Sequence, residues 1–336
     1  MIAIRALTGA DKQEAKKIWE LRFHDSPSFI RWYFSERFSP GTSFCAVENG
    51  RIVSIAHGSP MRLRVRNAEF PAMMVSGVAT LPGYEGRGLM KRVLFRLFEN
   101  CKKSGVPLAF HTPSHFSIYR ALGEFPCADA LLHTCGGDPD AKPVSDGVPS
   151  AAELLRVYER ATARYSGCVV RTEADMQKRI HDLLCDGGIC LTHSAGGVLD
   201  GYLFAAKTDV VYASEEALAV SREAYAALIS RLPEGSAVKL PPDVDLPGKL
   251  YPQGVVIPLD ISFLLKALCG DPQALCVRVA DGMLPWNDDV FDGAGNAVDM
   301  EPRETLSAGR LMQFLCGYLP YKDVFSQLPC FCADEY

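Results

Sequence analysis

The spacing of hydrophobic positions in the first 125 residues predicts helices and antiparallel strands in mixed order. A helix over 10–23 carries its apolar side chains at a period near 3.6. Asn49-Gly50, between two strand-like runs, is the strongest short signal for a β-hairpin. The remaining elements expected here are strands over 2–5, 43–48, 51–57, 61–65, 70–80 and 108–112, and helices over 26–38, 89–104 and 117–122.

Two polar segments divide the rest of the chain. Residues 136–149 and 241–248 are rich in Gly, Pro, Asp and Ser, which is typical of linkers. They predict units at about 1–140, 150–245 and 250–336. The middle unit is expected to hold helices over 151–164, 173–185 and 221–230 and strands over 189–193, 201–206 and 210–213, and the third unit strands over 254–258 and 274–279 and helices over 261–269 and 305–318. The middle unit repeats the first in abbreviated form without a glycine-rich turn, so we expect it to carry no chemistry of its own.

Composition narrows the class of protein. The chain has 336 residues, a net charge of −5, 48% hydrophobic and 22% charged residues, which is typical of a folded globular protein. It has no basic block for nucleic acid or anionic lipid, no apolar run of the roughly 18 residues that a membrane span needs, and no basic, apolar leader. We therefore expect a cytoplasmic protein whose twelve cysteines are reduced thiols. The cysteines and the seven histidines lack zinc-site spacing, so no metal is expected.

The stretch 73–90 carries the clearest chemistry. A predicted strand runs into Pro82, and a turn containing Gly86, Arg87 and Gly88 then leads into a helix. Glycines let a ligand approach the backbone, and the amides and dipole of a helix N-terminus favour a diphosphate, to which Arg87 can add a charge. The alternative is a strand-to-helix connection that merely needs small residues.

This stretch resembles motif A of the GNAT acetyltransferase superfamily, in which a strand ending in Pro precedes an Arg/Gln-x-x-Gly-x-Gly/Ala turn that grips the pyrophosphate of acetyl-CoA. Two positions depart from the motif: Glu85 stands where Arg or Gln is usual, and Met90 replaces the last small residue. Because backbone amides make most of the grip, Glu85 bears on affinity more than on the existence of the site.

A second stretch, 114–123, resembles the Ser-x-x-x-Ile-Tyr-x-x-x-Gly segment of the enhanced intracellular survival (Eis) family. The similarity extends over the chain through 23–26 with Phe29 and Trp32, through 284–287, and through the Glu335-Tyr336 terminus. The resemblance implies a mixed α+β fold with an active GNAT domain (1–140), a second GNAT-like domain without an active site (150–245), and a sterol-carrier-protein-like domain (250–336) whose C-terminus reaches the active site.

The resemblance implies an acetyl-CoA-dependent N-acetyltransferase that acts on a primary amine by direct attack. Tyr119 is then the general acid, and the C-terminal carboxylate of Tyr336 assists deprotonation. The expected cofactor-binding residues are Val78, Ala79, Thr80, Gly86, Arg87, Gly88, Leu89, Met90 and Ser114, with the Val78 amide at the oxyanion. The expected substrate-binding residues are Asp25, Phe29, Trp32 and Glu335. Cys101 and Cys127 lack a histidine signature, so no acyl-enzyme is expected.

Structural alternatives stay open for several of these residues. Tyr119, Phe29 and Trp32 could pack in the core, and Ser114 could cap the short helix. The terminus could be a disordered tail. Trp286 is expected to anchor the third unit, and His24, His111 and His115 are expected to be structural.

Two other functions also stay open: a degenerate acyl-CoA sensor, with Glu85 as the sign of lost activity, and a carrier of an apolar ligand. Aminoglycosides and protein lysines are both acceptors that the resemblance allows, and self-association is left open.

Overall fold

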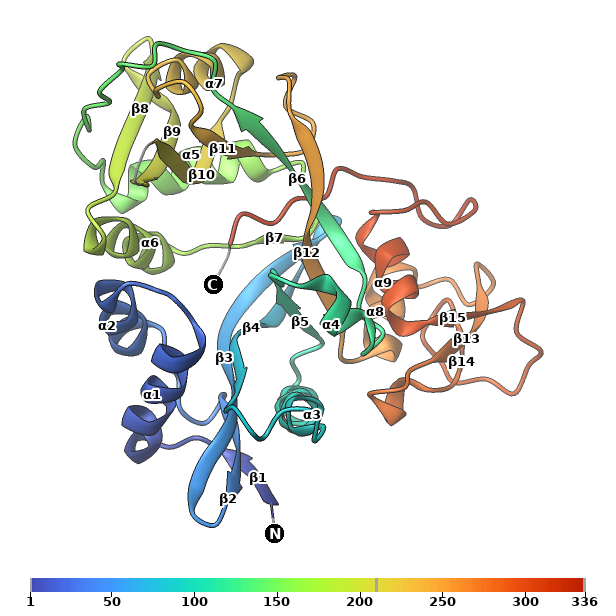
Figure 1. The fold of residues 1–336 in the computed structure, drawn as a ribbon. Helices are drawn as coiled ribbons and strands as arrows, with labels where there is room; N and C mark the ends of the chain where they lie inside the picture. Colours follow the sequence, from blue (N-terminus) through green and yellow to red (C-terminus); the bar gives the residue numbers. More distant parts are fainter. Residues whose placement is uncertain (1, 209–210, 335–336) are drawn as a thin grey trace.

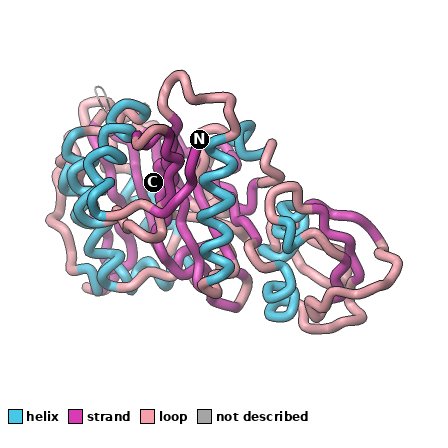
Figure 2. Tube along the Cα trace, turned by 90° about the horizontal axis from the view of Figure 1, so that it is seen from below, coloured by secondary structure: helices cyan, strands magenta, loops and turns pink. Residues whose placement is uncertain are grey.

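A computed structural model describes residues 2–208 and 211–334. Its main sheet has twelve strands in the order β1-β2-β3-β4-β5-β12-β6-β11-β10-β9-β8, with β7 paired to β3. A three-stranded sheet of order β14-β13-β15 stands apart, and Figure 2 shows it in a part of the molecule that projects to one side. The mixed α+β class expected from the sequence is confirmed.

The N-terminal region, 2–140, is an antiparallel meander closed by one parallel pair of strands. Its strands are β1 (Ile2–Ala6), β2 (Phe44–Glu48), β3 (Arg51–Val65), β4 (Ala68–Thr80), β5 (Leu108–His111) and β6 (Pro126–Thr134). Its helices are η1 (Gly9–Asp11), α1 (Lys12–Arg22), α2 (Pro27–Glu36), α3 (Leu89–Lys103) and α4 (Phe116–Arg120). The helices α1 and α2 cover one face of the β1–β5 sheet and α3 covers the other (Figure 1).

The middle region, 150–245, continues the same sheet. Its elements are α5 (Ala151–Thr162), β7 (Cys168–Val169), α6 (Glu173–Cys185), β8 (Ile189–Ala195), β9 (Val198–Lys207), β10 (Tyr212–Ala219), α7 (Arg222–Ile229) and β11 (Ala237–Leu240). The helices begin at Ser150, Thr172 and Ser221, whose hydroxyls each accept a hydrogen bond from an amide three residues on. These N-caps explain why all three predicted helices form.

The C-terminal region, 250–334, begins in the main sheet. The strand β12 (Lys249–Pro258) lies between β5 and β6 and is antiparallel to both, so it joins the first two regions. The sequence analysis placed its second half, 254–258, in a separate small layer. The remaining elements are α8 (Ile261–Leu268), β13 (Cys276–Ala280), η2 (Pro285–Asn287), β14 (Val290–Asp292), β15 (Glu304–Ser307) and α9 (Ala308–Cys316).

Some predicted elements differ in the structure. The predicted strands 51–57 and 61–65 are one continuous strand, β3. The predicted helix start at Thr305 is wrong, because Thr305 belongs to β15 and pairs with Arg278 of β13. The helix starts only after Ser307, whose hydroxyl accepts from the Arg310 amide at 3.2 Å. The strands β6, β7, β11, β14 and β15 were not predicted.

The last described residues return to the middle region. After α9 the chain crosses to β7 (Figure 1), where Cys330 pairs with Ser166 in an isolated parallel β-bridge. Phe331 and Asp334 are each 2% exposed. The Asp334 carboxylate lies 3.2 Å from the Arg171 guanidinium. Residues 330–334 are therefore a packed part of the fold.

Candidate active site

A β-bulge interrupts β4 where it faces α1. The register between β3 and β4 shifts between Ile55 and His57, so that Gly77 and Val78 both stand opposite one residue of β3. Gly77 has φ of +56°, and a Cβ atom there would lie 2.3 Å from the Trp19 ring. A bulge turns one backbone amide out of the ladder. Glycine is therefore required here, and the bulge is held against Trp19.

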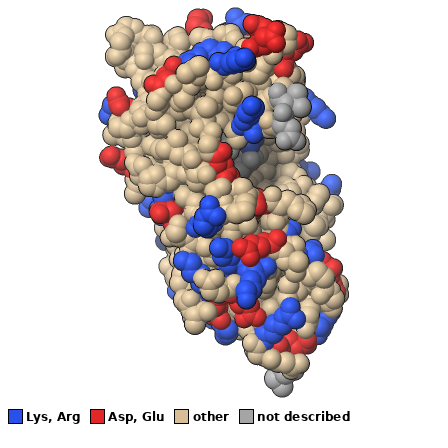
Figure 3. Space-filling model, turned by 60° about the vertical axis from the view of Figure 1, so that its left-hand side comes forward, with Lys and Arg blue, Asp and Glu red and all other residues tan. Residues whose placement is uncertain are grey.

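The strands β4 and β5 diverge just before the bulge. Their paired stretch covers residues 72–74 and 108–110. Residues 75–78 and 111–114, which follow it, line one cavity of about 870 Å³. Figure 3 shows a hollow midway along this face of the molecule, with acidic side chains at its edge. The divergence opens the sheet where the bulged amide lies.

The cavity walls come from all three regions. Asp25 and Phe29, near the start of α2, line the side formed by the N-terminal region. The Asp25 carboxylate is fixed by the Trp19 indole, which donates a 2.7 Å hydrogen bond. The opposite walls are lined by Arg179, Asp182, Asp186, Ser214, Lys239, Tyr251, Pro252 and Gln253. The middle region therefore helps to build the cavity.

The contribution of α6 was missed by the sequence analysis. Arg179 and Asp182 are hydrogen-bonded at 2.5 Å, and burial raises the pKa of Asp182, opposed by the Arg179 charge. Asp186 accepts hydrogen bonds from Ser26 and Ser28, which ties α6 to α2. The signal was present, because residues at spacings of three and four share one helix face. Charged residues on that face indicate a wet interface rather than a core.

Tyr119 projects from α4 into the same cavity. Burial, with a smaller effect of the Glu124 charge, raises the pKa of Tyr119 to about 12. Its ring meets the His111 ring edge to face, with centroids 4.3 Å apart. A phenol with a raised pKa stays protonated at neutral pH, so it is able to donate a proton to a leaving group.

The turn before α3 fits a phosphate group. Gly86 and Gly88 have φ of +72° and +70°, and a Cβ at either would meet no atom within 4 Å. Gly88 is the N-cap of α3 and supplies no side chain, so the first amides of the helix stay open to a ligand. Beside this turn lies a groove of about 580 Å³, whose lining includes Lys91, Arg92 and Arg96.

The charges on the turn are paired. Glu85 lies 2.7 Å from Arg22, and Arg87 lies 2.7 Å from Glu48. The negative charge of Glu85 is therefore compensated beside the turn, and Arg87 shares its charge with Glu48. This leaves the backbone amides as the main anion-binding groups.

The structure brings together many, but not all, of the predicted site residues. Asp25, Phe29, Val78, Ser114 and Tyr119 line the main cavity. The helix α4 has His115 as its N-cap, so the capping role considered for Ser114 is not observed. Glu335 and Tyr336 lie outside the described residues.

Other predicted residues lie behind these walls. Trp32 is 6% exposed and packs in the core, and it does not line the cavity. Ala79 and Leu89 are buried as well. The Thr80 hydroxyl lies 2.9 Å from that of Ser54, and Met90 packs against the core. Any contact of Ala79 and Leu89 with a ligand therefore runs through their backbone, whereas Thr80 and Met90 are half-buried.

A polar network under the bulge was also missed. The Tyr33 hydroxyl lies 2.8 Å from the Ser76 hydroxyl and 3.2 Å from Nδ1 of His57. Burial lowers the pKa of His57 to about 3, so this histidine is neutral. Tyr33 and His57 pack behind the bulge. Of the three residues in the network, Ser76 lines the cavity.

Two further searches were limited to the described residues. Within 2–208 and 211–334, no group of three or more His, Cys, Asp or Glu side chains is arranged to hold a metal ion. None of the helices in that part of the chain is long and apolar enough to cross a membrane.

Comparison with known proteins identifies the N-terminal region. Residues 3–125 match the family model for an acetyltransferase (GNAT) domain. Residues 3–125 are therefore a GNAT acetyltransferase domain. The bulged β4, its divergence from β5 and the glycine turn before α3 all lie inside the matched residues. No curated protein sequence matches the chain.

Solved structures share the fold of this chain over its full length. A conserved protein of unknown function from Enterococcus faecalis V583, described as a probable N-acyltransferase, is 15% identical, with 100% of both chains covered and a TM-score of 0.79. Eis1 from Mycobacterium abscessus is 16% identical, with 100% of both chains covered and a TM-score of 0.76. A GCN5-related N-acetyltransferase from Kribbella flavida is 16% identical, covering 100% of this chain and 98% of its own, with a TM-score of 0.74. The expected Eis-like architecture is confirmed as a fold.

Proposed function

We propose that this GNAT-family protein transfers the acetyl group of acetyl-CoA directly to a primary amine. The observation that carries the proposal is the bulged β4, which diverges from β5 at a cavity that also holds Tyr119. Attack on a thioester needs a positioned amine, stabilisation of the developing oxyanion and a proton for the departing sulfur. The backbone amide of Val78 serves the oxyanion, and Tyr119 serves as the general acid.

Acetyl-CoA fits the residues present on the N-terminal region. The open amides at Gly86–Gly88 and at the start of α3 suit its pyrophosphate, and the basic groove beside them suits further phosphate. In this arrangement the backbone of 78–80 and 86–90 holds the cosubstrate, and Arg87 and Ser114 add polar contacts. The chain supplies binding and orientation, and the thioester supplies the activated acetyl group.

The acceptor side of the cavity suits a cationic amine. Asp25, Asp182 and Asp186 line it, and Phe29 adds an apolar surface. We place the C-terminal carboxylate of Tyr336, with Glu335, at this side as a group that assists deprotonation, and Trp32 as support behind Phe29. Both terminal residues lie outside the described chain, but the burial of Asp334 against Arg171 brings the described chain end into the middle region beside this cavity.

The three regions then have separate roles. We assign catalysis to residues 1–140, a second GNAT-like scaffold without an active site to 150–245, and a sterol-carrier-protein-like domain to 250–336. The repetition of antiparallel strands followed by a helix in β8–β9–β10–α7 supports the second assignment.

The test is release of CoA thiol by the purified protein with acetyl-CoA and a panel of cationic amines. We expect turnover with at least one amine, and Tyr119→Phe should lower kcat about 100-fold, because general acid catalysis contributes a factor of about 10² to 10⁴. Turnover by Tyr119→Phe equal to that of the unaltered protein would remove the assigned acid. Thermal stabilisation by acetyl-CoA without turnover on any amine would instead favour an acyl-CoA sensor.

A further inference from the structure

A buried histidine and a buried glutamate form a pair behind Tyr119. Nε2 of His111 lies 2.6 Å from a carboxylate oxygen of Glu124, and both side chains are 5% exposed. His111 ends β5 and lines the main cavity, and Glu124 follows α4. We infer that His111, oriented by Glu124, is a catalytic proton acceptor for the acetyl transfer, an inference that rests on the proposed function.

The hydrogen bond to Glu124 fixes the chemistry of the imidazole. A carboxylate accepts, so Nε2 carries the hydrogen and Nδ1 keeps its lone pair. Since Nε2 is engaged by Glu124, Nδ1 is the nitrogen left to take a proton in the proposed step. The buried carboxylate then stabilises the imidazolium that forms when Nδ1 takes a proton.

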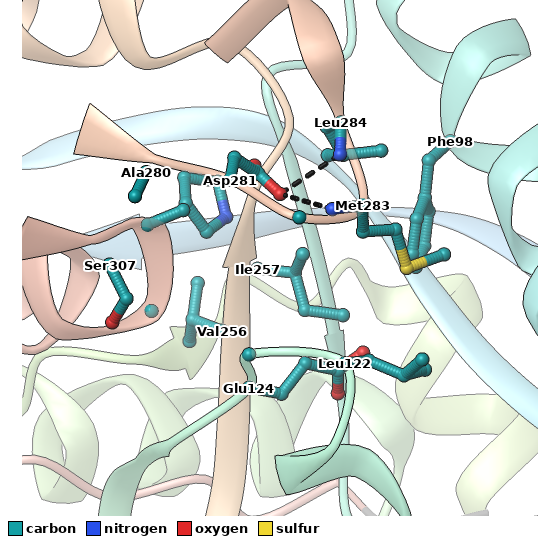
Figure 4. A pocket seen from close by; sticks show the side chains of 15 residues that line it. Phe98, Leu122, Glu124, Val256, Ile257, Ala280, Asp281, Met283, Leu284 and Ser307 are labelled. Carbon is teal, nitrogen blue, oxygen red and sulfur yellow. Dashed lines mark hydrogen bonds between the residues drawn. The ribbon is translucent and has the colours of Figure 1, made fainter. Parts of the chain in front are cut away.

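Glu124 keeps a second carboxylate oxygen, Oε1, that is not bonded to His111. Oε1 is buried and has no hydrogen-bond partner among the described residues. Glu124 also lines a pocket of about 40 Å³ between the N-terminal and C-terminal regions. Figure 4 shows Glu124 below Val256 and Ile257, with Asp281 at the far side accepting hydrogen bonds from the amides of residues 283 and 284.

The reaction releases two protons from the amine substrate, and His111 can accept one of them. An attacking ammonium group must lose two protons to become an amide nitrogen, one before attack and one as the carbon–nitrogen bond becomes an amide. His111 takes one of them at Nδ1, and the other leaves to solvent with the help of the terminal carboxylate. As the carbon–sulfur bond breaks, Tyr119 gives its proton to the sulfur, and the imidazolium returns a proton to Tyr119.

The charged and titratable groups around His111 come from several elements. Tyr119 on α4 and Glu124 after it are in direct contact with the ring. The walls of the cavity that His111 lines carry Asp25, Arg179, Asp182, Asp186 and Lys239. Both signs of charge are present on these walls. Among the described residues, the charged group recorded in contact with the imidazole is the Glu124 carboxylate.

The experiment compares His111→Ala, Glu124→Gln and a matched pair outside the cavity. His193 and Asp200 are also bonded at 2.6 Å, on the β8–β9 hairpin, and neither lines the cavity. The pH profile of kcat, and KM for the amine, are measured for His111→Ala, Glu124→Gln and His193→Ala, with and without added imidazole. Tyr119→Phe with imidazole is the control for rescue.

We expect His111→Ala to lower kcat about 100-fold with little change in KM and to lose the acidic limb of the kcat profile. Imidazole should restore at least tenfold of the lost rate, and Glu124→Gln should lower kcat about tenfold. His193→Ala should stay within twofold of the unaltered protein, and Tyr119→Phe should gain nothing from imidazole. Should His111→Ala fail to fold, His111→Gln is measured in its place for kcat and the profile.

Three results would overturn the inference. A His111 variant with normal kcat removes the histidine from the chemistry. A loss of rate with an unchanged acidic limb and no imidazole rescue makes the pair a structural brace for Tyr119. Both results leave the proposed function standing, whereas absence of turnover by the unaltered protein on every amine removes the function and the inference together.

Discussion

The main sheet contains the same local succession twice, and only one copy has a glycine-rich turn between its bulged strand and its helix. In the N-terminal region the bulged β4 leads through the turn 81–88 into α3. In the middle region β10 also shifts register, between Ser214 and Glu216, and leads through two residues into α7. A bulged strand followed by a helix is therefore not sufficient for a site.

The N-termini of α3 and α7 differ in which group is available to accept hydrogen bonds from the first amides of the helix. Gly88, the N-cap of α3, has no side chain to offer. Ser221, the N-cap of α7, accepts a hydrogen bond from the Ala224 amide at 3.1 Å. A capped helix has satisfied part of its own anion-binding capacity. The glycine turn of the N-terminal region therefore leaves the first amides of α3 open to a phosphate, whereas an amide at the start of α7 is already bonded to the Ser221 hydroxyl.

The interiors beside the two bulges differ as well. Val78 lines the cavity, whereas the corresponding stretch of β10 holds Glu216, which is 3% exposed. Arg171 donates two hydrogen bonds to Glu216, at 2.8 and 2.6 Å, and also contacts Asp334. In the middle region these buried charges neutralise one another. Through Arg171 the bulged strand holds Asp334, near the end of the described chain, and its Glu216 is not open to a ligand.

The largest effect is expected from breaking that ion cluster. Arg171→Met should lower the free energy of unfolding by about 3–5 kcal/mol, because it leaves Asp334 without the Arg171 guanidinium and Glu216 with the more distant Arg179, at 3.6 Å, as its cation. Urea denaturation measures the loss. The control is Arg222→Ala, which removes an exposed ion pair with Asp245 and should change stability by less than about 1 kcal/mol. Equal losses in the two variants would contradict the comparison.

The same pair predicts a dependence on pH. Burial acts to raise the pKa of Glu216, but the charges of Arg171 and Arg179 and the hydrogen bonds from Arg171 and Tyr202 together outweigh it, and the net pKa lies below the ordinary value of 4.5. A carboxylate with a lowered folded pKa stabilises the protein above the unfolded value and loses that contribution as pH falls through the folded value. The stability difference between the unaltered protein and Arg171→Met should therefore shrink below about pH 4.5.

The second largest effect is expected at the other bulge. Gly77→Ala places a Cβ against Trp19 in a backbone conformation with φ of +56°, so we expect a loss of about 1–3 kcal/mol and at least a tenfold lower kcat/KM. Trp19 fixes Asp25, so its displacement disturbs the acceptor wall. The control is Gly196→Ala, which has φ of +59° but open space, and it should leave activity unchanged. Normal activity of Gly77→Ala would show that the bulge is not required.

The sequence predicted the parts of the site that depend on local spacing. The stretch around Gly86 and Gly88, and Tyr119 on its short helix, lie where their motifs indicated. Phe29 and Trp32 lie on one side of α2. A helical period predicts which side they share but does not predict how deeply each side chain is buried. The structure leaves Phe29 half-buried on the cavity wall and buries Trp32 to 6% exposure.

The remaining parts depend on pairings between distant segments. The strand β6 contains Pro126 and Asp129, which disfavour a strand, yet it is paired on both sides by β12 and β11. The insertion of β12 between β5 and β6 brings Tyr251 and Gln253 to the cavity. His111 was expected to be a structural histidine because its partner, Glu124, becomes visible only when α4 folds back. No local pattern carries these contacts.

The smallest effect is expected at the cap of α7. Ser221→Ala should lower the free energy of unfolding by about 1 kcal/mol, since the loss of a hydroxyl N-cap typically costs that much. Ser150→Ala, which removes the cap of α5, is the matched control and should cost a similar amount. Neither change should alter the rise in Tm that acetyl-CoA produces, because the comparison assigns phosphate binding to α3 alone. A rise that differs in Ser221→Ala but not in Ser150→Ala would mean that the start of α7 also binds an anion, and the middle region would then have to be counted as a second site.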